Sequence, residues 1–245
     1  MRHFWRSYRL LLTWDLLRRR KVLPMIVVIQ VALSVGVVYG LAFLLPDVDP
    51  RSALYLSTGA PTLSMLILGL TVVPQEVSQA KLTGRAAWFS TLPVPRLAPL
   101  AAEITYWLAA SLPGTVLALA VAAHRFDFGL HVSPAVVPAL LLVAATASAV
   151  GYALATASAP QATQQVTSFM SIGILLFSPV NFPAEQLPGA LQAVHRVLPV
   201  EGMADIVRWS LTGRYVTHPG TAFAVVTAWC VGALLLSARV ATRRA

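Results

Sequence analysis

The chain has 245 residues, of which 57% are hydrophobic and 11% are charged, and its formal net charge is +9. A soluble domain of this length must cover itself with polar side chains, so the composition excludes that class. Several apolar runs instead reach the roughly 20 residues that a helix needs to cross a bilayer. We therefore predict an all-α integral membrane protein.

Residues 1–21 are interrupted by charge throughout and contain no signal-peptide cleavage site. On a helix, Arg2, Arg6 and Arg9 fall along one face, while aromatic and leucine side chains fall along another. This pattern is typical of a helix that lies in the membrane interface with its cations toward lipid headgroups. The alternative is a frayed, charged tail.

Six apolar runs are expected to cross the membrane as helices, at 22–45, 53–73, 97–122, 134–157, 166–182 and 217–237. An even number of crossings places both termini on one side. With the N-terminus in the cytoplasm, the inner segments carry 13 of the 18 Lys and Arg residues. The positive-inside rule therefore favours cytoplasmic termini. It also explains the basic charge better than nucleic-acid binding does.

Polar residues inside the expected spans are mostly Ser, Thr and Gln. Five of them are candidates for a translocation path: Gln30, Ser34, Ser57, Thr58 and Thr62. Glu103 is the only acid within an expected span, so a proton relay or a site for a cationic substrate is one interpretation. Because it lies near the inner end of its helix, we prefer a structural pairing with a basic neighbour. Ala147, Gly151 and Ala155, spaced by four residues, favour close helix packing over a substrate path.

Residues 183–214 are too polar to cross a membrane and too apolar to form a simple loop. Their periodicity predicts two short amphipathic helices at the outer membrane face, acting as a lid. The apolar face of the first helix holds Leu187, Leu191, Val194 and Leu198. The second helix begins near Glu201 and ends toward Gly213, a residue suited to a C-cap. The four outer histidines, His124, His131, His195 and His218, have no metal-ligand spacing, so we expect them on polar faces.

Residues 74–96 form a cytoplasmic segment in this topology. Its first part can form a short polar helix, and Pro93 and Pro95 then break the chain. Five polar side chains are expected to be exposed there: Gln75, Glu76, Gln79, Lys81 and Arg85. On physical grounds a docking site and an ordinary solvated loop are equally compatible with this pattern.

The order of these features resembles the permease subunits of ABC-2 type exporters. The first family pattern is a Gly, then Pro-Val nine residues on, then a basic residue, and it is matched by Gly84, Pro93-Val94 and Arg96. The second pattern follows the fifth span and is matched by Phe182-Pro183, Leu187-Pro188, Leu198-Pro199, Arg208 and Gly213. Two positions depart from the family: Lys81 stands where acids are common, and Glu103 stands where a Lys is frequent.

The resemblance implies one transmembrane domain over 1–245, with the fold of a type-II ABC exporter: an interfacial helix, six spans, a coupling helix and two outer helices. It implies two cytoplasmic ATPase subunits that bind ATP and Mg, a second permease copy or a paralogue, and contact with membrane lipids. Docking of the ATPase would use the coupling segment, at Gln75, Glu76, Gln79, Lys81, Gly84 and Arg85. The outer gate would use Phe182, Pro183, Leu187, Pro188, Leu191, Val194, Pro199 and Arg208.

The chain contains no G-x-x-x-x-G-K-[ST] phosphate loop and no catalytic motif. We therefore expect no catalytic, cofactor or metal site in this chain, and ATP hydrolysis would belong to the partner subunit. The nearly uncharged spans suit an apolar or amphipathic cargo, such as a drug, a peptide antibiotic or a lipid-like molecule. Abundant Arg and Ala suggest a GC-rich bacterial gene, and with the resemblance this implies a place in the bacterial inner membrane. The first alternative is a secondary transporter or channel that works without an ATPase. The second alternative is a membrane enzyme.

Overall fold

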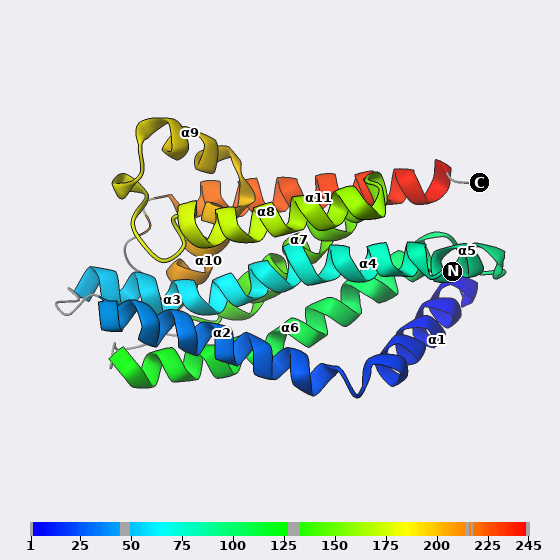
Figure 1. Ribbon diagram of the computed structural model, residues 1–245, viewed down its shortest axis with the longest axis horizontal. Helices are drawn as coiled ribbons and strands as arrows, with labels where there is room; N and C mark the ends of the chain where they lie inside the picture. Colours follow the sequence, from blue (N-terminus) through cyan, green and yellow to red (C-terminus); the bar gives the residue numbers. More distant parts are fainter. Residues whose placement is uncertain (1, 45–49, 127–132, 214–215, 217, 244–245) are drawn as a thin grey trace.

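The computed structural model describes residues 2–44, 50–126, 133–213, 216 and 218–243, and this part of the chain is helical without any β-strand (Figure 1). The helices in chain order are α1 (Arg2–Arg19), α2 (Leu23–Leu44), α3 (Pro50–Ile67), η1 (Leu68–Val72), α4 (Val73–Leu82), α5 (Arg85–Thr91), α6 (Leu97–Phe126), α7 (Val136–Ala157), α8 (Pro160–Phe177), η2 (Ala184–Gln186), α9 (Gly189–Val197), α10 (Pro199–Thr212) and α11 (Pro219–Arg243).

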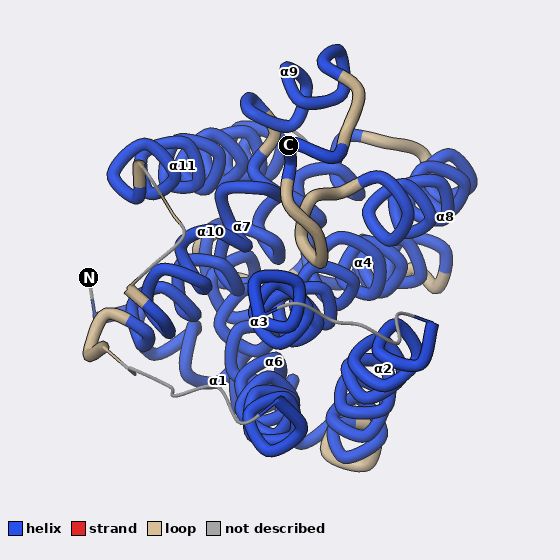
Figure 2. Tube along the Cα trace, turned by 90° about the vertical axis from the view of Figure 1, so that its left-hand side faces the viewer, coloured by secondary structure: helices blue, strands red, loops and turns tan. Residues whose placement is uncertain are grey.

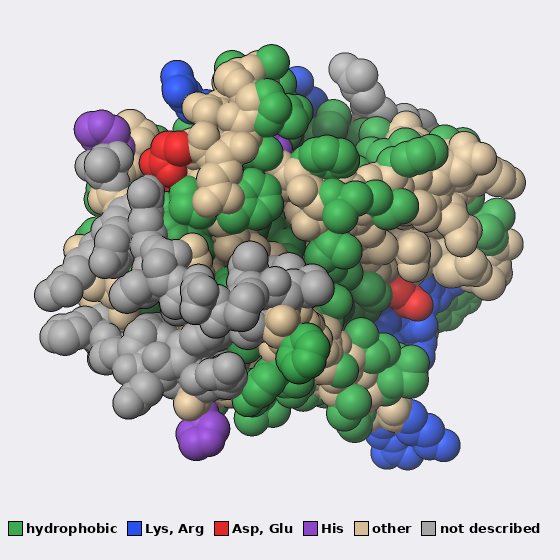
Figure 3. Space-filling model, turned by 60° about the vertical axis from the view of Figure 1, so that its left-hand side comes forward, with side chains coloured by type: hydrophobic (Ala, Val, Ile, Leu, Met, Phe, Trp, Pro, Cys, Tyr) green, Lys and Arg blue, Asp and Glu red, His purple; other side chains and the backbone are tan. Residues whose placement is uncertain are grey.

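The long helices run side by side, and both chain termini lie at one end of the bundle (Figure 1). We call this the terminal end; it holds α1, α5 and the end of α11. The opposite end holds α9 and the beginnings of α3 and α11. In the view along the bundle, α3 lies in the middle and the other long helices surround it (Figure 2). Figure 3 turns this opposite end toward the viewer, and the described side chains on the face shown are mostly hydrophobic or uncharged.

Five helical stretches of the described chain are long and apolar enough to cross a membrane: Leu23–Gly40, Leu54–Leu82, Leu97–Val121, Val136–Ala157 and Pro219–Val240. The expected crossing at 166–182 corresponds to α8, which begins six residues earlier and is not one of the five. Gln161, Gln164 and Gln165 in its first turns make it too polar to qualify. The chain is thus an all-α, multi-pass membrane protein, but six equivalent apolar spans are not confirmed.

The second span and the coupling segment are one continuous helical rod, whereas the sequence predicted a boundary near residue 73. The π-helical turn η1 joins α3 to α4, and the N–H of Val73 donates to the carbonyl of Leu68. Pro74 follows directly and has no N–H to donate, so a locally widened turn accommodates it. The 29 residues from Leu54 to Leu82 rise about 43 Å, against roughly 30 Å of hydrocarbon core. One end of this rod therefore extends beyond the core.

Helix α7 packs against η1 at backbone distance. A Cβ atom built on Gly69 would collide with Ala147, and one built on Gly151 would collide with the carbonyl oxygen of Gly69. Ala147, Gly151 and Ala155 are all buried. The spacing of small residues is therefore a close-packing device, as expected.

The two helices of 183–214 differ from the expected surface lid. Helix α9 lies at the edge of the bundle, whereas α10 is inserted among α3, α7 and α11 (Figures 1 and 2). Met203, Ile206 and Val207 of α10 belong to the main hydrophobic core. Helix α9 is also rotated relative to the prediction, because Val194 is 52% exposed while His195 is only 8% exposed. The expectation that His195 lies on a polar face is wrong. Of the other outer histidines, His131 lies outside the described residues.

Candidate functional site

A cluster of charged side chains joins three helices at the terminal end. Its centre is Arg19, whose side chain is 5% exposed. Arg19 Nη2 lies 2.8 Å from Glu103 Oε1 on α6, 3.5 Å from Glu76 Oε2 on α4 and 3.8 Å from Asp15 Oδ1 on α1. Arg18 adds a second cation, 3.4 Å from Asp15 and 4.0 Å from Glu76. We call these five residues the Arg19 cluster.

Aromatic side chains complete the surroundings of the Arg19 guanidinium. It lies over the rings of Tyr106 and Trp107, 4.7 Å and 5.0 Å from their centroids. The indole N–H of Trp107 also donates to Glu103 Oε1 at 2.9 Å. Glu103 thus has a cation and a donor on the same oxygen, and the structure agrees with the preferred pairing with a basic neighbour. Burial, followed by the negative charge of Glu103, raises the pKa of Asp15.

Helix α4 has a second attachment at its other end. The Lys81 ammonium donates to the carbonyls of Ala155, Thr156 and Ser158, which end helix α7. The last carbonyls of a helix have no partner within the helix and carry its negative dipole end, so a cation there is favourable. The coupling segment is therefore tied to α1 and α6 through Glu76 and to α7 through Lys81.

The exposed surface of the coupling segment differs from the expectation. Of its five polar residues only Gln79 is exposed, and Gln75, Glu76, Lys81 and Arg85 are half-buried. Much of the exposed surface is apolar, since Leu82 is 59% exposed and Trp88 is 52% exposed. Trp88 lies on α5, a helix that the sequence did not predict. Gly84 joins α4 to α5 at a φ of 72°, a left-handed conformation that favours glycine.

A second buried cation lies at the opposite end. Arg208 is fully buried on α10 and donates to Asp205 Oδ1 at 2.7 Å and to the carbonyl of Val180 at 2.9 Å. Its guanidinium lies 3.8 Å from the centroid of the Tyr55 ring on α3. Arg208 therefore fixes α10 to α3 and to the connection after α8. Its part in an outer gate stays a prediction.

A cavity of about 610 Å³ opens beside Arg208, between α9, α10 and the start of α11. Its polar lining includes Glu201, Asp205, His195 and His218. Burial raises the pKa of Glu201, and the negative charge of Asp205 raises it further. Burial lowers the pKa of His195. The described residues contain no group of three or more His, Cys, Asp or Glu side chains that could hold a metal ion.

The other expected gate residues are divided between surface and interior. Pro183 and Pro199 are buried, whereas Phe182, Leu187 and Leu191 are partly exposed and Pro188 is exposed. The apolar face of α9 is therefore only partly covered by the bundle.

The five candidate path residues are all buried, and within this chain most of them bond to helix backbone. The hydroxyls of Ser34, Thr58 and Thr62 donate to the carbonyls of Ala60, Leu54 and Thr58, respectively. Hydroxyls bonded in this way add little polarity to the surface of a helix. Gln30 differs, because it lines a cavity of about 280 Å³ between α2 and α3 that extends to Arg19 and Glu76. The role of these five residues in a translocation path stays a prediction.

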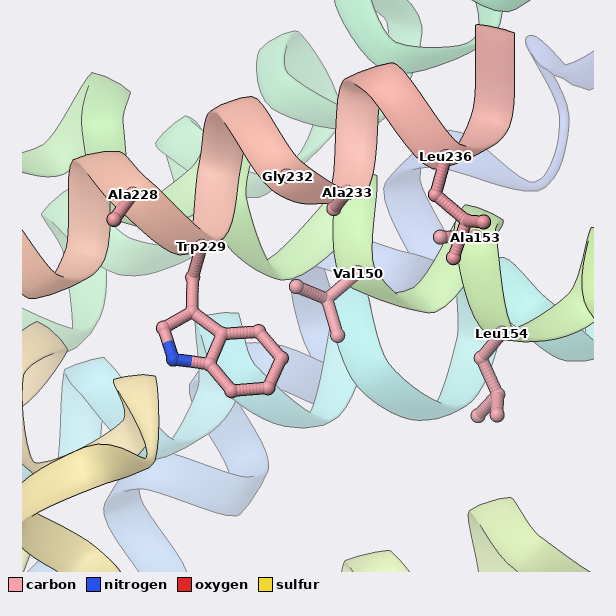
Figure 4. Close-up of a pocket in the computed structure, with 8 residues that line it drawn as sticks. All are labelled: Val150, Ala153, Leu154, Ala228, Trp229, Gly232, Ala233 and Leu236. Atoms are coloured by element: carbon pink, nitrogen blue, oxygen red, sulfur yellow. The ribbon is translucent and has the colours of Figure 1, made fainter. Parts of the chain in front are cut away.

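An apolar groove of about 450 Å³ runs between α7 and α11 (Figure 4). Val150, Ala153 and Leu154 line it from α7, and small residues line it from α11. Trp229 borders one end and donates from its indole N–H to the carbonyl of Val197 on α9. The lining contains no charged side chain. Such a groove is suited to acyl chains or to another apolar helix.

The sequence reasoning missed the centre of the Arg19 cluster. Asp15 is the only acid among the first 21 residues and precedes Arg19 by four positions, the spacing of a helical ion pair. That signal was present in the sequence. The sequence gives no signal that Glu76 and Glu103 converge on the same guanidinium, because this depends on how α1 folds back against α6.

The fold and these contacts define a multi-pass helical membrane protein whose long helices are tied together at each end by a buried arginine. The family model of the ABC-2 type transporter matches residues 7–212, well over half of the chain. The chain belongs to the ABC-2 type transporter family. It is also similar to Nodulation protein J of Rhizobium meliloti (strain 1021), with 34% identity over 71 residues. That match covers 29% of this chain and 27% of the relative.

Proposed function

We propose that this chain is the permease subunit of an ATP-driven exporter. It would move an apolar or amphipathic substrate out of the cytoplasm or the inner leaflet. Two permease subunits, identical or paralogous, would frame the pathway, and two ATPase subunits carrying ATP and Mg would dock at the terminal end. Family membership supports the transport class, and the attachment of α4 supports the mechanism.

That attachment is the observation on which the proposal rests. A displacement of α4 would reach α3 through the continuous rod, α1 and α6 through the Arg19 cluster, and α7 through Lys81. Elements tied by buried polar contacts move together, so a local push becomes a rigid-body shift of the bundle. Helix α9, at the edge of the bundle, would be the moving part of the outer gate. Helix α10 would be its fixed base, since it is packed in the core.

The terminal end would face the cytoplasm of a bacterial cell, because basic residues collect there. Helix α8 would make the sixth crossing. Its exposed face carries Gln161, Gln164 and Gln165, followed by Phe169. Exposed amides are costly in lipid. This face would therefore be covered by the second permease subunit.

The docking test uses the exposed Gln79, because reversing the charge of Glu76, Lys81 or Arg85 would break contacts within the chain. The permease is co-expressed with its candidate ATPase, and co-purification and ATP-dependent extrusion from proteoliposomes are measured. Gln79→Arg should reduce both co-purification and ATP-dependent extrusion. Gln186→Arg, a change at another exposed position at the opposite end, should leave both intact. Substrate flux driven by an ion gradient without any ATPase would refute the proposal in favour of a secondary transporter.

A further inference from the structure

A cavity at the terminal end is lined by more basic than acidic side chains. It measures about 560 Å³ and lies between α4, α5 and the ends of α6, α7 and α11. Four charged side chains line it: Lys81, Arg85, Arg96 and Glu103. Apolar side chains form much of the remaining wall, among them Phe89, Val94 and Val240.

Contacts within the chain already balance part of this charge. Glu103 is paired with Arg19, and Lys81 is held by the last carbonyls of α7. Arg85 is different. Among the described residues its guanidinium has one hydrogen bond, to the carbonyl of Glu76 at 3.4 Å, and no carboxylate within 4.0 Å. Burial, and then the positive charges of Arg18 and Arg19, lower the pKa of Arg85. An anion beside Arg85 would relieve this repulsion.

The position of the cavity indicates which anion. Its walls include Pro99 near the start of one candidate span, Thr156 near the end of another and Val240 at the end of a third. The cavity therefore lies at the depth where these helices leave the hydrocarbon core. Basic pockets between helix ends on the cytoplasmic side attract anionic lipid headgroups. A phosphate at Arg85 would have apolar side chains beside it for the glycerol and the first acyl carbons.

We propose that this cavity binds an anionic phospholipid of the inner leaflet, with its phosphate at Arg85. The assignment rests on the proposed orientation, in which the terminal end is cytoplasmic. The lipid would contact α4, α5, α6, α7 and α11 together. It would thereby link the coupling segment to the spans through a ligand, in addition to the Arg19 cluster.

The test measures lipid binding to the delipidated permease alone, in detergent, by native mass spectrometry. Failure of ATPase docking would leave this measurement unaffected. The probes are dioleoyl phosphatidylglycerol and dioleoyl phosphatidylcholine. Phosphatidylglycerol should bind saturably, and Arg85→Gln should weaken it by about tenfold to a hundredfold, the usual effect of losing one charge-assisted hydrogen bond. Arg6→Gln, which removes an exposed cation of α1, should bind like wild type.

A second pair of variants keeps Arg85 in place. Ala86 is exposed and lines the cavity, whereas Ala87 is exposed and does not. Ala86→Glu should supply an internal carboxylate to the cavity and reduce phosphatidylglycerol binding, while Ala87→Glu should not. Both are surface changes on α5 and should not disturb folding. This pair therefore still tests the proposal if the Arg85→Gln protein proves unstable.

Four results would overturn the proposal. The first is equal phosphatidylglycerol binding by wild type, Arg85→Gln and Ala86→Glu, and the second is equally tight binding of phosphatidylcholine. The third is displacement of the lipid by millimolar inorganic phosphate, which would assign the cavity to a free anion. The fourth is displacement by the ATPase subunit, which would assign Arg85 to an acidic protein partner.

Discussion

Arg19 is nearly inaccessible to water and has an acidic partner on each of three helices. Removing one member of a buried ion pair leaves the other charge uncompensated. We expect Arg19→Gln to lower the free energy of unfolding by about 3–5 kcal/mol, measured by thermal unfolding in detergent. The control is Arg18→Gln, because Arg18 is more exposed and should contribute about 0–1 kcal/mol. Equal stability of the two variants would show that the Arg19 cluster does not hold the helices together.

Glu201 gives a prediction with a defined pH dependence. Because its pKa is raised in the folded protein, the folded state binds the proton more tightly than the unfolded state does. The stabilisation that Glu201 contributes is fully present at acidic pH. It is lost as the pH rises from the ordinary pKa of a Glu carboxyl group through the raised pKa of the folded state. Glu201→Gln should therefore raise the melting temperature at pH 7 and leave it unchanged near pH 4. The gain should be at most about 1 kcal/mol, since water screens a half-buried group. A destabilised variant at pH 7 would contradict this.

The contact between α7 and η1 leaves no space for a methyl group. Gly151→Ala would drive a Cβ into the carbonyl of Gly69 and bring it within 2.9 Å of Pro74 Cδ. The rod and α7 would have to separate, at a cost of about 1–3 kcal/mol. Gly173→Ala on α8 is the control, because a Cβ there meets nothing within 4 Å. It should be neutral or slightly stabilising. The comparison uses melting temperatures, and a stable Gly151→Ala protein would show that this packing adapts.

The sequence was informative about elements whose signals are local. The N-terminal helix, five of the six expected apolar spans and the small-residue face of α7 follow from charge, hydropathy and spacing. Helix α5 was missed because we expected only the first part of 74–96 to be helical before the chain breaks at Pro93 and Pro95. The depth of α10 was missed because an amphipathic pattern specifies which face is buried, not whether lipid or protein covers it. The Arg19 cluster depends on three segments meeting, which no single stretch of sequence reports.

Cysteine accessibility can test both the orientation of the bundle in the membrane and whether α8 crosses the membrane. In a Cys230→Ser background, single cysteines replace Gln79, Gln161, Gln186 and His218, all of which are exposed. An impermeant thiol reagent applied to intact cells should label positions 186 and 218 only, because our proposal places them outside. Labelling at 161 as well as 186 would show that α8 does not cross. Labelling at 79 and 161 alone would reverse the orientation.

The burial of α10 constrains how this protein can be made. A segment carrying Glu201, Asp205 and a fully buried Arg208 would not partition into lipid by itself. Its partners Tyr55 and Val180 are synthesised earlier, but it also packs against α11, which is synthesised after it. Insertion of α10 should therefore be among the final steps of biogenesis. A ribosome-bound chain that stops before α11 should leave α10 accessible to protease, and completion of the chain should protect it.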